Sequence, residues 1–197
     1  MKLPDYSISD THFTDPIIAE HFGRYSPSQP SLEDIDGAMV KNWNGVVGVN
    51  YRSVIHVGDL LFGPRREEAE YYVNKLIGKK ILVKGNHDKQ SNSYYEDLGF
   101  EVHDYIELYY NGFRVLFTHK PLKGLLDTDI NIHGHIHNAA NDFITAAHIN
   151  VCVEQHGFAP RKTAYLLDRT IYRLKFIGES ADRDRDLERV LGLSEER

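Results

Sequence analysis

Short apolar runs, each ended abruptly by polar residues, recur along the first half of the chain. The first run closes at Ile8, the second covers Ser53 to Val57 and the third covers Lys80 to Lys84. Runs of this length that are rich in β-branched residues are typical of buried strands. Between them, apolar residues recur at helical spacing. The pattern therefore predicts strands that alternate with helices, and hence a mainly parallel sheet.

Four helices are predicted in the first half of the chain. The longest follows the N-cap Ser31, with Asp34 in an imperfect capping box, and is expected to end at about Asn44 because Gly45 comes next. Trp43 lies on its apolar face and is expected in the core. The other helices are predicted over residues 16–22, 64–77 and 91–98.

The second half of the chain has a different pattern. Two apolar runs flank Asn111-Gly112, which is the strongest short-range signal for a β-hairpin. Further short strands are predicted over residues 130–133, 143–144, 148–153, 163–167 and 171–176. We expect these strands to form a second sheet that is more antiparallel than the first.

The length of 197 residues favours one domain, which we place at residues 1–178. After Gly178 the chain is strongly charged, and residues 179–197 are predicted to form an amphipathic helix or a solvated tail. The composition is ordinary for a globular protein, with 41% hydrophobic and 26% charged residues. No apolar run approaches the ~20 residues that a membrane span needs, so no membrane contact is expected.

Cysteine content and net charge indicate the cellular compartment and the kind of partner that the protein has. The single cysteine, Cys152, cannot form an internal disulfide, and its neighbours Val151 and Val153 predict a buried, inert thiol. The first residues do not resemble a signal peptide, so we expect a cytoplasmic protein. The net charge of −6, without a basic cluster, argues against non-specific binding to nucleic acid duplexes.

Polar residues capable of chemistry gather where the predicted strands end. Carboxylate, amide and imidazole groups of this kind are ligands for divalent metals such as manganese, iron or zinc. They exceed what one tetrahedral ion needs, so two ions that share one carboxylate are expected, with Asp59 as the bridge. The residues are Asp10, His12, Asp59, Asn86, His119, His135 and His137.

The charge of such a site indicates the class of substrate. Two divalent ions would bring four positive charges, and Asp10 and Asp59 would return two negative ones. The remaining charge of about +2 suits a phosphate oxyanion, and a metal pair suits phosphoryl displacement.

The chain resembles the calcineurin-like metallophosphoesterases over about residues 5 to 160. The resemblance depends on a series of motifs in the same order and spacing, namely Asp10-x-His12, Gly58-Asp59, Gly85-Asn86-His87-Asp88, His119 and Gly134-His135-x-His137. Within that superfamily the chain looks most like the small, single-domain bacterial and phage enzymes.

This resemblance implies an α/β fold in the form of a four-layer α/β/β/α sandwich, in which two mixed sheets are flanked by helices. It also implies that Asp10, His12 and His137 hold one metal and that Asn86, His119 and His135 hold the other, with Asp59 between them. A metal-bound hydroxide would attack phosphorus. His87 would be the general acid, and Asp88 would orient its imidazole.

The expected substrate is a small phosphate ester, a monoester or a diester, with nucleotides and cyclic nucleotides among the candidates. The expected cofactors are two divalent ions, of Mn, Fe, Zn or Ni, with Mn favoured. Two alternatives stay open: a manganese-dependent nuclease, and a non-catalytic metal-binding scaffold on the same fold. The oligomeric state and the native substrate do not follow from the sequence.

Several residues outside these motifs have two interpretations. His56 and His133 precede predicted ligands and are expected either to support them or to be ordinary buried histidines. Arg24 could grip a phosphate, although an ordinary exposed arginine is the favoured interpretation. Cys152 and Glu154 stand where the resembling family more often carries Gly and Asp, so no role is assigned to Glu154.

Overall fold

The computed structural model describes residues 1–48 and 51–177. The strands are β1 Tyr6–Ile8, β2 Ser53–His56, β3 Lys79–Val83, β4 Phe100–His103, β5 Ile106–Tyr110, β6 Phe113–Thr118, β7 Asp129–His133, β8 His148–Asn150 and β9 Arg161–Lys162. The α-helices are α1 Pro16–His21, α2 Leu32–Val47, α3 Arg66–Val73, α4 Asn92–Asp97 and α5 Thr163–Tyr172. Short 3₁₀ turns cover Gly63–Arg65 and Val153–His156, and a π-helical stretch covers Arg173–Ile177.

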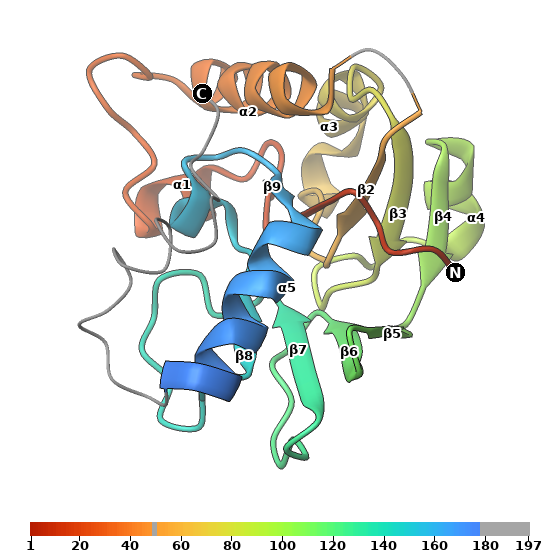
Figure 1. Cartoon of the computed structure of the whole chain (residues 1–197). Coiled ribbons are helices and arrows are strands. Elements are labelled where there is room, and N and C mark those ends of the chain that lie inside the picture. Colours follow the sequence, from red (N-terminus) through yellow and green to blue (C-terminus); the bar gives the residue numbers. More distant parts are fainter. Residues whose placement is uncertain (49–50, 178–197) are drawn as a thin grey trace.

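These strands form two mixed sheets, as predicted (Figure 1). The first has the order β4-β3-β2-β1-β9, in which only β9 runs antiparallel to its neighbour. The second has the order β5-β6-β7-β8, in which the predicted β5–β6 hairpin is antiparallel and the other pairs are parallel. Within the second sheet, the expected antiparallel pairing is therefore confined to that hairpin.

The strand register brings the carboxyl ends of the parallel strands to one edge of each sheet. In the first sheet Ile8 pairs with His56, so the residues after β1 and β2 leave the sheet together. In the second sheet Thr118 pairs with His133, and His133 pairs with Asn150. Loops that follow strands in this way are where α/β proteins place their ligands.

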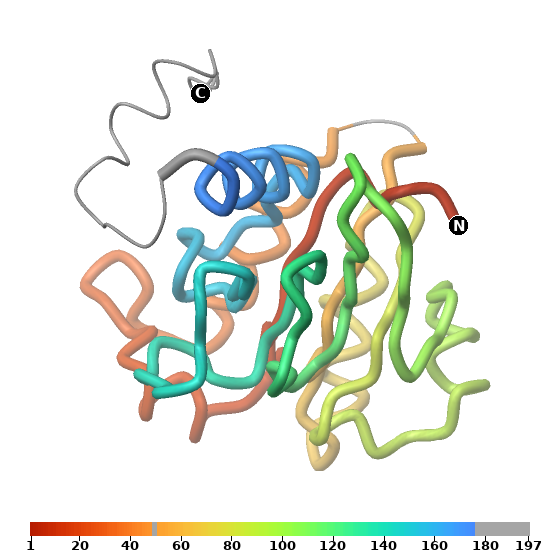
Figure 2. The backbone as a smooth tube through the Cα atoms, turned by 60° about the horizontal axis from the view of Figure 1, so that its bottom comes forward, coloured from red at the N-terminus to blue at the C-terminus, as the bar shows by residue number. Residues whose placement is uncertain are grey.

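Alternating side chains of the first sheet build two separate cores. Ile8, Val54 and Leu82 face α2 and α3, whose buried residues include Trp43. Ile55 and Ile81 face the second sheet and pack in one cluster with its apolar side chains and with Leu166, Leu167 and Ile171 of α5. The period of two along each strand explains why both faces are apolar. Figure 2 shows the β5–β6 hairpin lying against the strands of the first sheet.

The helix predicted from Ser31 is longer than expected. The Ser31 hydroxyl accepts a hydrogen bond from the Asp34 amide, and the Asp34 carboxylate accepts one from the Ser31 amide, so the capping box is complete. The helix continues through Gly45 and ends at Gly48, where φ is +69°. A glycine at positive φ after the last turn is the usual helix terminator, so Gly45 was the wrong end point.

The largest error in the predicted secondary structure concerns residues 163–176. Residues 163–167 and 171–176 were predicted as strands, but they form α5 and the π-helical stretch. Thr163, Leu166, Leu167, Thr170 and Ile171 are buried at intervals of three and four residues, which is helical spacing. The predicted strand at 143–144 is a turn, and β4 was not predicted.

The predicted charged segment, residues 179–197, lies outside the described residues, so the division of the chain at residue 178 stays a prediction. Within residues 1–48 and 51–177, no helix is long and apolar enough to cross a bilayer.

Candidate metal centre

Five of the seven predicted ligands have an unusual backbone conformation. The φ angles are +59° at Asp10, +47° at His12, +56° at Asp59, +71° at His135 and +48° at His137. Non-glycine residues rarely adopt positive φ, which costs roughly 1–3 kcal/mol each and is concentrated at functional sites. The loops that carry these five residues are therefore bent, and the surrounding structure holds them in this conformation.

One group of possible ligands consists of Asp10, His12 and His137. The Asp10 Oδ1 atom lies 3.7 Å from His12 Nε2 and 3.5 Å from His137 Nε2. All three side chains are buried. Oδ1 of Asp10 and both ring nitrogens of His12 have no hydrogen-bond partner among the described residues. Buried polar atoms without partners are rare and costly, and a cation held between them would satisfy them.

The other group consists of Asp59, His119 and His135, with Asn86 beside it. Nδ1 of His119 lies 2.9 Å from the Val57 carbonyl, which can only accept, so this nitrogen donates. In the neutral ring Nε2 is then an acceptor, yet it faces Asn86 Oδ1 at 3.1 Å and Asp59 Oδ2 at 3.2 Å. Three acceptors that face one another need a positive charge between them.

The titration behaviour of these groups agrees with that need. Burial alone would lower the pKa of His119, but the hydrogen bond to Asp59 and the charge of Asp10 raise it above its usual value. Burial alone would raise the pKa of Asp10, yet His12, His119 and His137 hold it well below its usual range. The cluster therefore favours ionised carboxylates and added positive charge.

Asp59 connects the two groups. Its Oδ2 atom lies 3.6 Å from His12 Nε2 of the first group and 3.2 Å from His119 Nε2 of the second. Its Oδ1 atom accepts a hydrogen bond of 2.8 Å from the His87 amide, which fixes the carboxylate. The bridging role that the sequence suggests for Asp59 stays a prediction.

The second oxygen of Asp10 is held by the protein itself. Oδ2 accepts hydrogen bonds from the Ser9 hydroxyl, from the His135 amide at 2.9 Å and from the Cys152 thiol at 3.2 Å. Cys152 is buried, as predicted, but its thiol has this role, which the sequence did not reveal. Burial and the Asp10 charge raise the pKa of Cys152, so the thiol keeps its proton and remains a donor. With Oδ2 occupied, Oδ1 is the atom left for a cation.

His87 and Asp88 have different surroundings although they are adjacent. The His87 side chain is exposed, and its ring lies 5.2 Å from the His12 ring at 75°. Asp88 is buried, and its carboxylate accepts hydrogen bonds from the amides of Asp59, Leu60 and Gly85 at 2.8–3.0 Å. The observed partners of Asp88 are thus backbone groups that hold the loop of Asp59, and its predicted action on the His87 imidazole stays a prediction.

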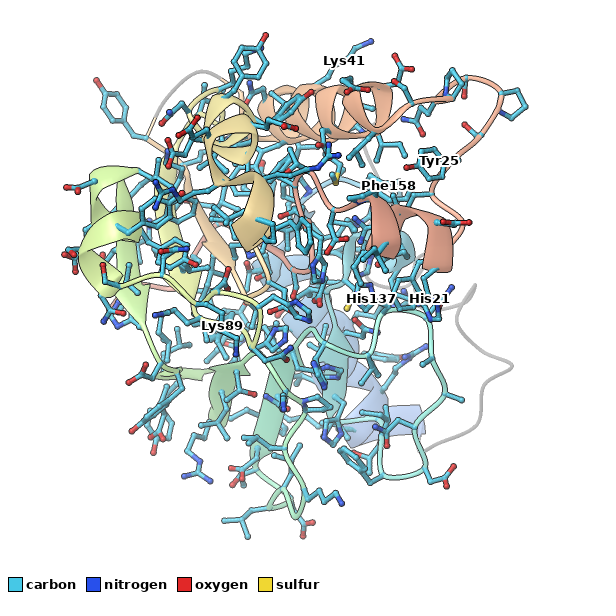
Figure 3. All side chains as sticks on the ribbon, turned by 180° about the vertical axis from the view of Figure 1, so that it is seen from behind. His21, Tyr25, Lys41, Lys89, His137 and Phe158 are labelled. Carbon is cyan, nitrogen blue, oxygen red and sulfur yellow. The ribbon has the colours of Figure 1, made fainter. Side chains whose placement is uncertain are left out.

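His137 is supported by Phe22, which directly follows α1, and by Glu154. The Phe22 ring stacks on the His137 ring with a centroid distance of 3.8 Å, and Glu154 Oε1 lies 3.0 Å from His137 Nδ1. Figure 3 shows His137 below α1, whose last residue is His21. Arg24, favoured as an exposed residue, is only 4% exposed and pairs with Glu154. That interpretation of Arg24 was therefore wrong, and Glu154 acquires a role beside a candidate ligand.

His56 and His133, which precede predicted ligands in the chain, lie outside both groups. His56 is buried, its Nε2 lies 3.0 Å from the Thr11 hydroxyl, and burial lowers its pKa to about 3. His133 donates from Nδ1 to the Gly134 carbonyl at 2.9 Å, and burial lowers its pKa to about 4. Both support loops that carry candidate ligands, through Thr11 and Gly134.

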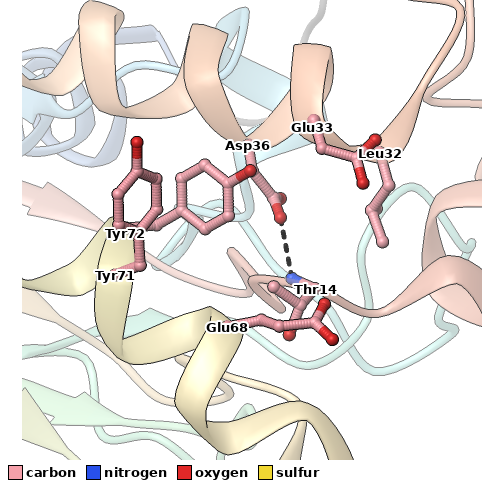
Figure 4. A pocket seen from close by; sticks show the side chains of 7 residues that line it. All are labelled: Thr14, Leu32, Glu33, Asp36, Glu68, Tyr71 and Tyr72. Carbon is pink, nitrogen blue, oxygen red and sulfur yellow. Dashed lines mark hydrogen bonds between the residues drawn. The ribbon is translucent and has the colours of Figure 1, made fainter.

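A separate cavity of about 380 Å³ lies between α2 and α3 (Figure 4). It does not contain the candidate ligands. Asp36 reaches from α2 into this region, and its Oδ2 atom accepts a hydrogen bond of 2.9 Å from the Thr14 amide. This contact fixes the loop that continues from His12. The cavity is lined by Thr14, Leu32, Glu33, Asp36, Glu68, Tyr71 and Tyr72.

The fold and the paired His/Asp groups define an α/β protein with two adjacent candidate metal positions. The model of the calcineurin-like phosphoesterase family matches residues 6–185. The chain belongs to this family, so the resemblance inferred from the motifs is confirmed. Proteins of the family use centres of two divalent metals, and the two groups described above could bind them.

Individual proteins and solved structures are similar to the chain to different degrees. The chain is 31% identical over 163 residues to an uncharacterized protein of Methanocaldococcus jannaschii, covering 79% of this chain and 84% of the relative. A crystal structure of a protein of unknown function from Aquifex aeolicus has a TM-score of 0.61 at 23% identity, covering 83% and 97% of the two chains. The fold is therefore shared. The nuclease MPE of Pseudomonas putida is more distant, with a TM-score of 0.41 at 18% identity over 66% of this chain and 60% of its own.

Proposed function

We propose that this protein is a metal-dependent phosphoric ester hydrolase that uses two divalent cations, with Mn²⁺ favoured, to cleave phosphomonoesters or phosphodiesters. The observation that carries the proposal is the position of Asp59, whose Oδ2 atom lies within 3.6 Å of a histidine from each of the two groups. Two cations that share one carboxylate in this way suit phosphoryl displacement.

The residues present fit two cations. Asp10, His12 and His137 would hold the first, and Asn86, His119 and His135 would hold the second, with Asp59 shared between them. Bound cations would lower the pKa of water toward neutrality and neutralise the phosphate oxygens. The acidic protein, with its net charge of −6, would thereby acquire a local positive site for an anionic substrate.

The protein itself would supply orientation and a proton. His87 is exposed beside the His12 ring, and its amide is fixed by Asp59, so its imidazole can reach a leaving oxygen. Histidine is the side chain that most often serves as a general acid or base in enzymes. Asp88 would keep this loop in place through its three backbone hydrogen bonds.

The test compares wild type with Asp59→Asn on an aryl phosphate monoester and diester. Protein freed of metal by chelation should be inactive and should recover with added Mn²⁺. Asp59→Asn should lose at least about 100-fold in kcat/KM, since even residues that only support ligands cost about 10–100-fold. Asp97→Asn, which removes an exposed carboxylate at the end of α4, is the control with the same change in charge and should keep full activity. Full activity without metal, or full activity of Asp59→Asn, would contradict the proposal.

A panel of substrates then addresses the alternatives. Phosphomonoesters, linear diesters, cyclic nucleotides and single-stranded DNA should each be tested with Mn²⁺. Cleavage of DNA alone would favour a nuclease. Binding of two metals without hydrolysis of any ester would favour the scaffold.

A further inference from the structure

Glu154 and Arg24 form a buried ion pair behind the candidate metal ligand His137. Glu154 Oε1 accepts hydrogen bonds from Arg24 Nε at 2.9 Å and from Arg24 Nη2 at 2.5 Å. The two side chains are 7% and 1% exposed, so both charges are withdrawn from water. A buried pair of this kind contributes little stability by itself, because the cost of removing both charges from water offsets their attraction.

The pair determines which nitrogen of His137 faces the candidate metal position. An ionised carboxylate can only accept, so His137 Nδ1, 3.0 Å from Glu154 Oε1, must be the donor. Nε2 of the neutral ring is then unprotonated, and it lies 3.5 Å from Asp10 Oδ1. A carboxylate partner on the far nitrogen also makes an imidazole a stronger metal ligand.

Arg24 extends this arrangement to the other ligands of the same group. Its Nη1 atom donates to the Thr11 carbonyl at 2.7 Å, and Nη2 donates to the Asp10 carbonyl at 2.8 Å. One guanidinium thus fixes the backbone between Asp10 and His12 and the carboxylate behind His137. The Phe22 ring, two residues earlier, stacks on His137 and limits its rotation.

The second group has a different kind of support. His119 Nδ1 donates to the neutral Val57 carbonyl and not to a carboxylate. We propose that Arg24 and Glu154 are positioning residues that set the affinity of the first metal position, formed by Asp10, His12 and His137, and leave the second largely unaffected. This inference rests on the proposed metal-dependent function.

Calorimetric titration of metal-free protein with Mn²⁺ can test the two positions separately. His119→Ala should leave the first position to be measured, and His137→Ala should leave the second. Adding Glu154→Gln should weaken Mn²⁺ binding by about 10–100-fold in the His119→Ala protein. The same substitution should change binding by less than about threefold in the His137→Ala protein. Glu154→Asp, which keeps the charge, should restore a large part of the affinity.

Arg24→Gln should resemble Glu154→Gln, and the double variant should be no weaker than either single variant, because the two residues act as one unit. Asp129→Asn is the stability control, since it breaks a 2.8 Å ion pair between the buried Asp129 and the partly exposed Arg114, outside both metal groups. It should lower the unfolding temperature without changing Mn²⁺ affinity.

The outcomes separate this inference from the proposed function. Wild type that binds no Mn²⁺ would overturn both. Wild type that binds two ions, with Glu154→Gln folded and unchanged in affinity or equally weakened at both positions, would overturn only the inference.

Discussion

The Nε2 atom of His12 lies 3.6 Å from the Oδ2 atom of Asp59, and this nitrogen has no hydrogen-bond partner among the described residues. His12 and Asp59 are 47 positions apart in the chain, at the ends of two neighbouring parallel strands. Their approach places the first group of candidate ligands beside the second. A cation is the simplest group that would satisfy both atoms.

Removal of divalent metal should therefore destabilise the folded protein. A ligand that binds only the native state adds about 2.7 kcal/mol to the free energy of unfolding when its concentration is 100 times Kd. Thermal unfolding should accordingly shift upward with Mn²⁺ and downward with chelator. Asp59→Asn should lose most of this shift. An unfolding temperature that does not change when Mn²⁺ is added at millimolar concentration would argue against a metal centre.

His87→Ala should slow hydrolysis selectively. General acid catalysis contributes about 10²–10⁴-fold, and it matters most when the leaving oxygen is basic. Alkyl phosphate esters should therefore lose about that much in kcat/KM, while p-nitrophenyl esters lose less than about tenfold. The measurement is a series of esters with graded leaving groups. An equal loss across the series would remove the acid role from His87.

Gly134→Ala should disrupt the first metal position although glycine carries no ligand. A methyl group at residue 134 would fall on the Ser9 hydroxyl and on Asp10 Oδ2, both of which are buried. We expect loss of Mn²⁺ binding, measured by titration of metal-free protein. Gly37→Ala is the matched control, because at that position on α2 the added methyl group would meet nothing within 4 Å beyond its chain neighbours and the backbone of its own helix. It should be neutral or stabilising by about 0.5–1 kcal/mol.

Asp36→Asn should change how stability depends on pH. Burial raises the pKa of Asp36 to about 7, more than the hydrogen bond from Thr14 lowers it. In the unfolded chain this carboxyl ionises near pH 3.8, so stability present at lower pH is lost as the pH rises to about 7 and stays lost above it. The asparagine does not titrate and keeps an acceptor for Thr14.

The free energy of unfolding of metal-free Asp36→Asn, measured with denaturant, should therefore exceed that of wild type at pH 8. Each tenfold change in proton affinity corresponds to about 1.4 kcal/mol, so a gain on the order of a few kcal/mol is expected. At pH 4 the gain should disappear. A difference between the two proteins that is constant with pH would contradict the assignment.

The positions of the candidate ligands could be predicted because strand ends are visible in the sequence. The runs before Asp10, Asp59 and Asn86 are short and end abruptly in polar residues, and parallel strands bring their ends to one edge. The local geometry could not be predicted in the same way. Positive φ at Asp10 and His12 is imposed by contacts with distant residues, including the amide hydrogen bond from Asp10 to Gly58.

Other features depend on contacts that no local pattern encodes. Arg24 lies in a loop rich in Pro and Ser, which suggests exposure. It is nevertheless buried and pairs with Glu154, 130 positions later in the chain. Residues 163–176 contain β-branched and aromatic side chains that favour strands, but packing against both sheets selects a helix. Tertiary packing overrode local propensity at this segment.

Each candidate ligand group draws on both sheets. Asp10 and His12 follow a strand of the first sheet and His137 follows one of the second, while Asp59 faces His119 and His135 in the same way. A bound cation would therefore link the two sheets, as a disulfide bond between them would. With a single cysteine, the chain has no internal disulfide for this purpose. The cations proposed for catalysis would thus also hold the two sheets together at the edge that carries the candidate ligands.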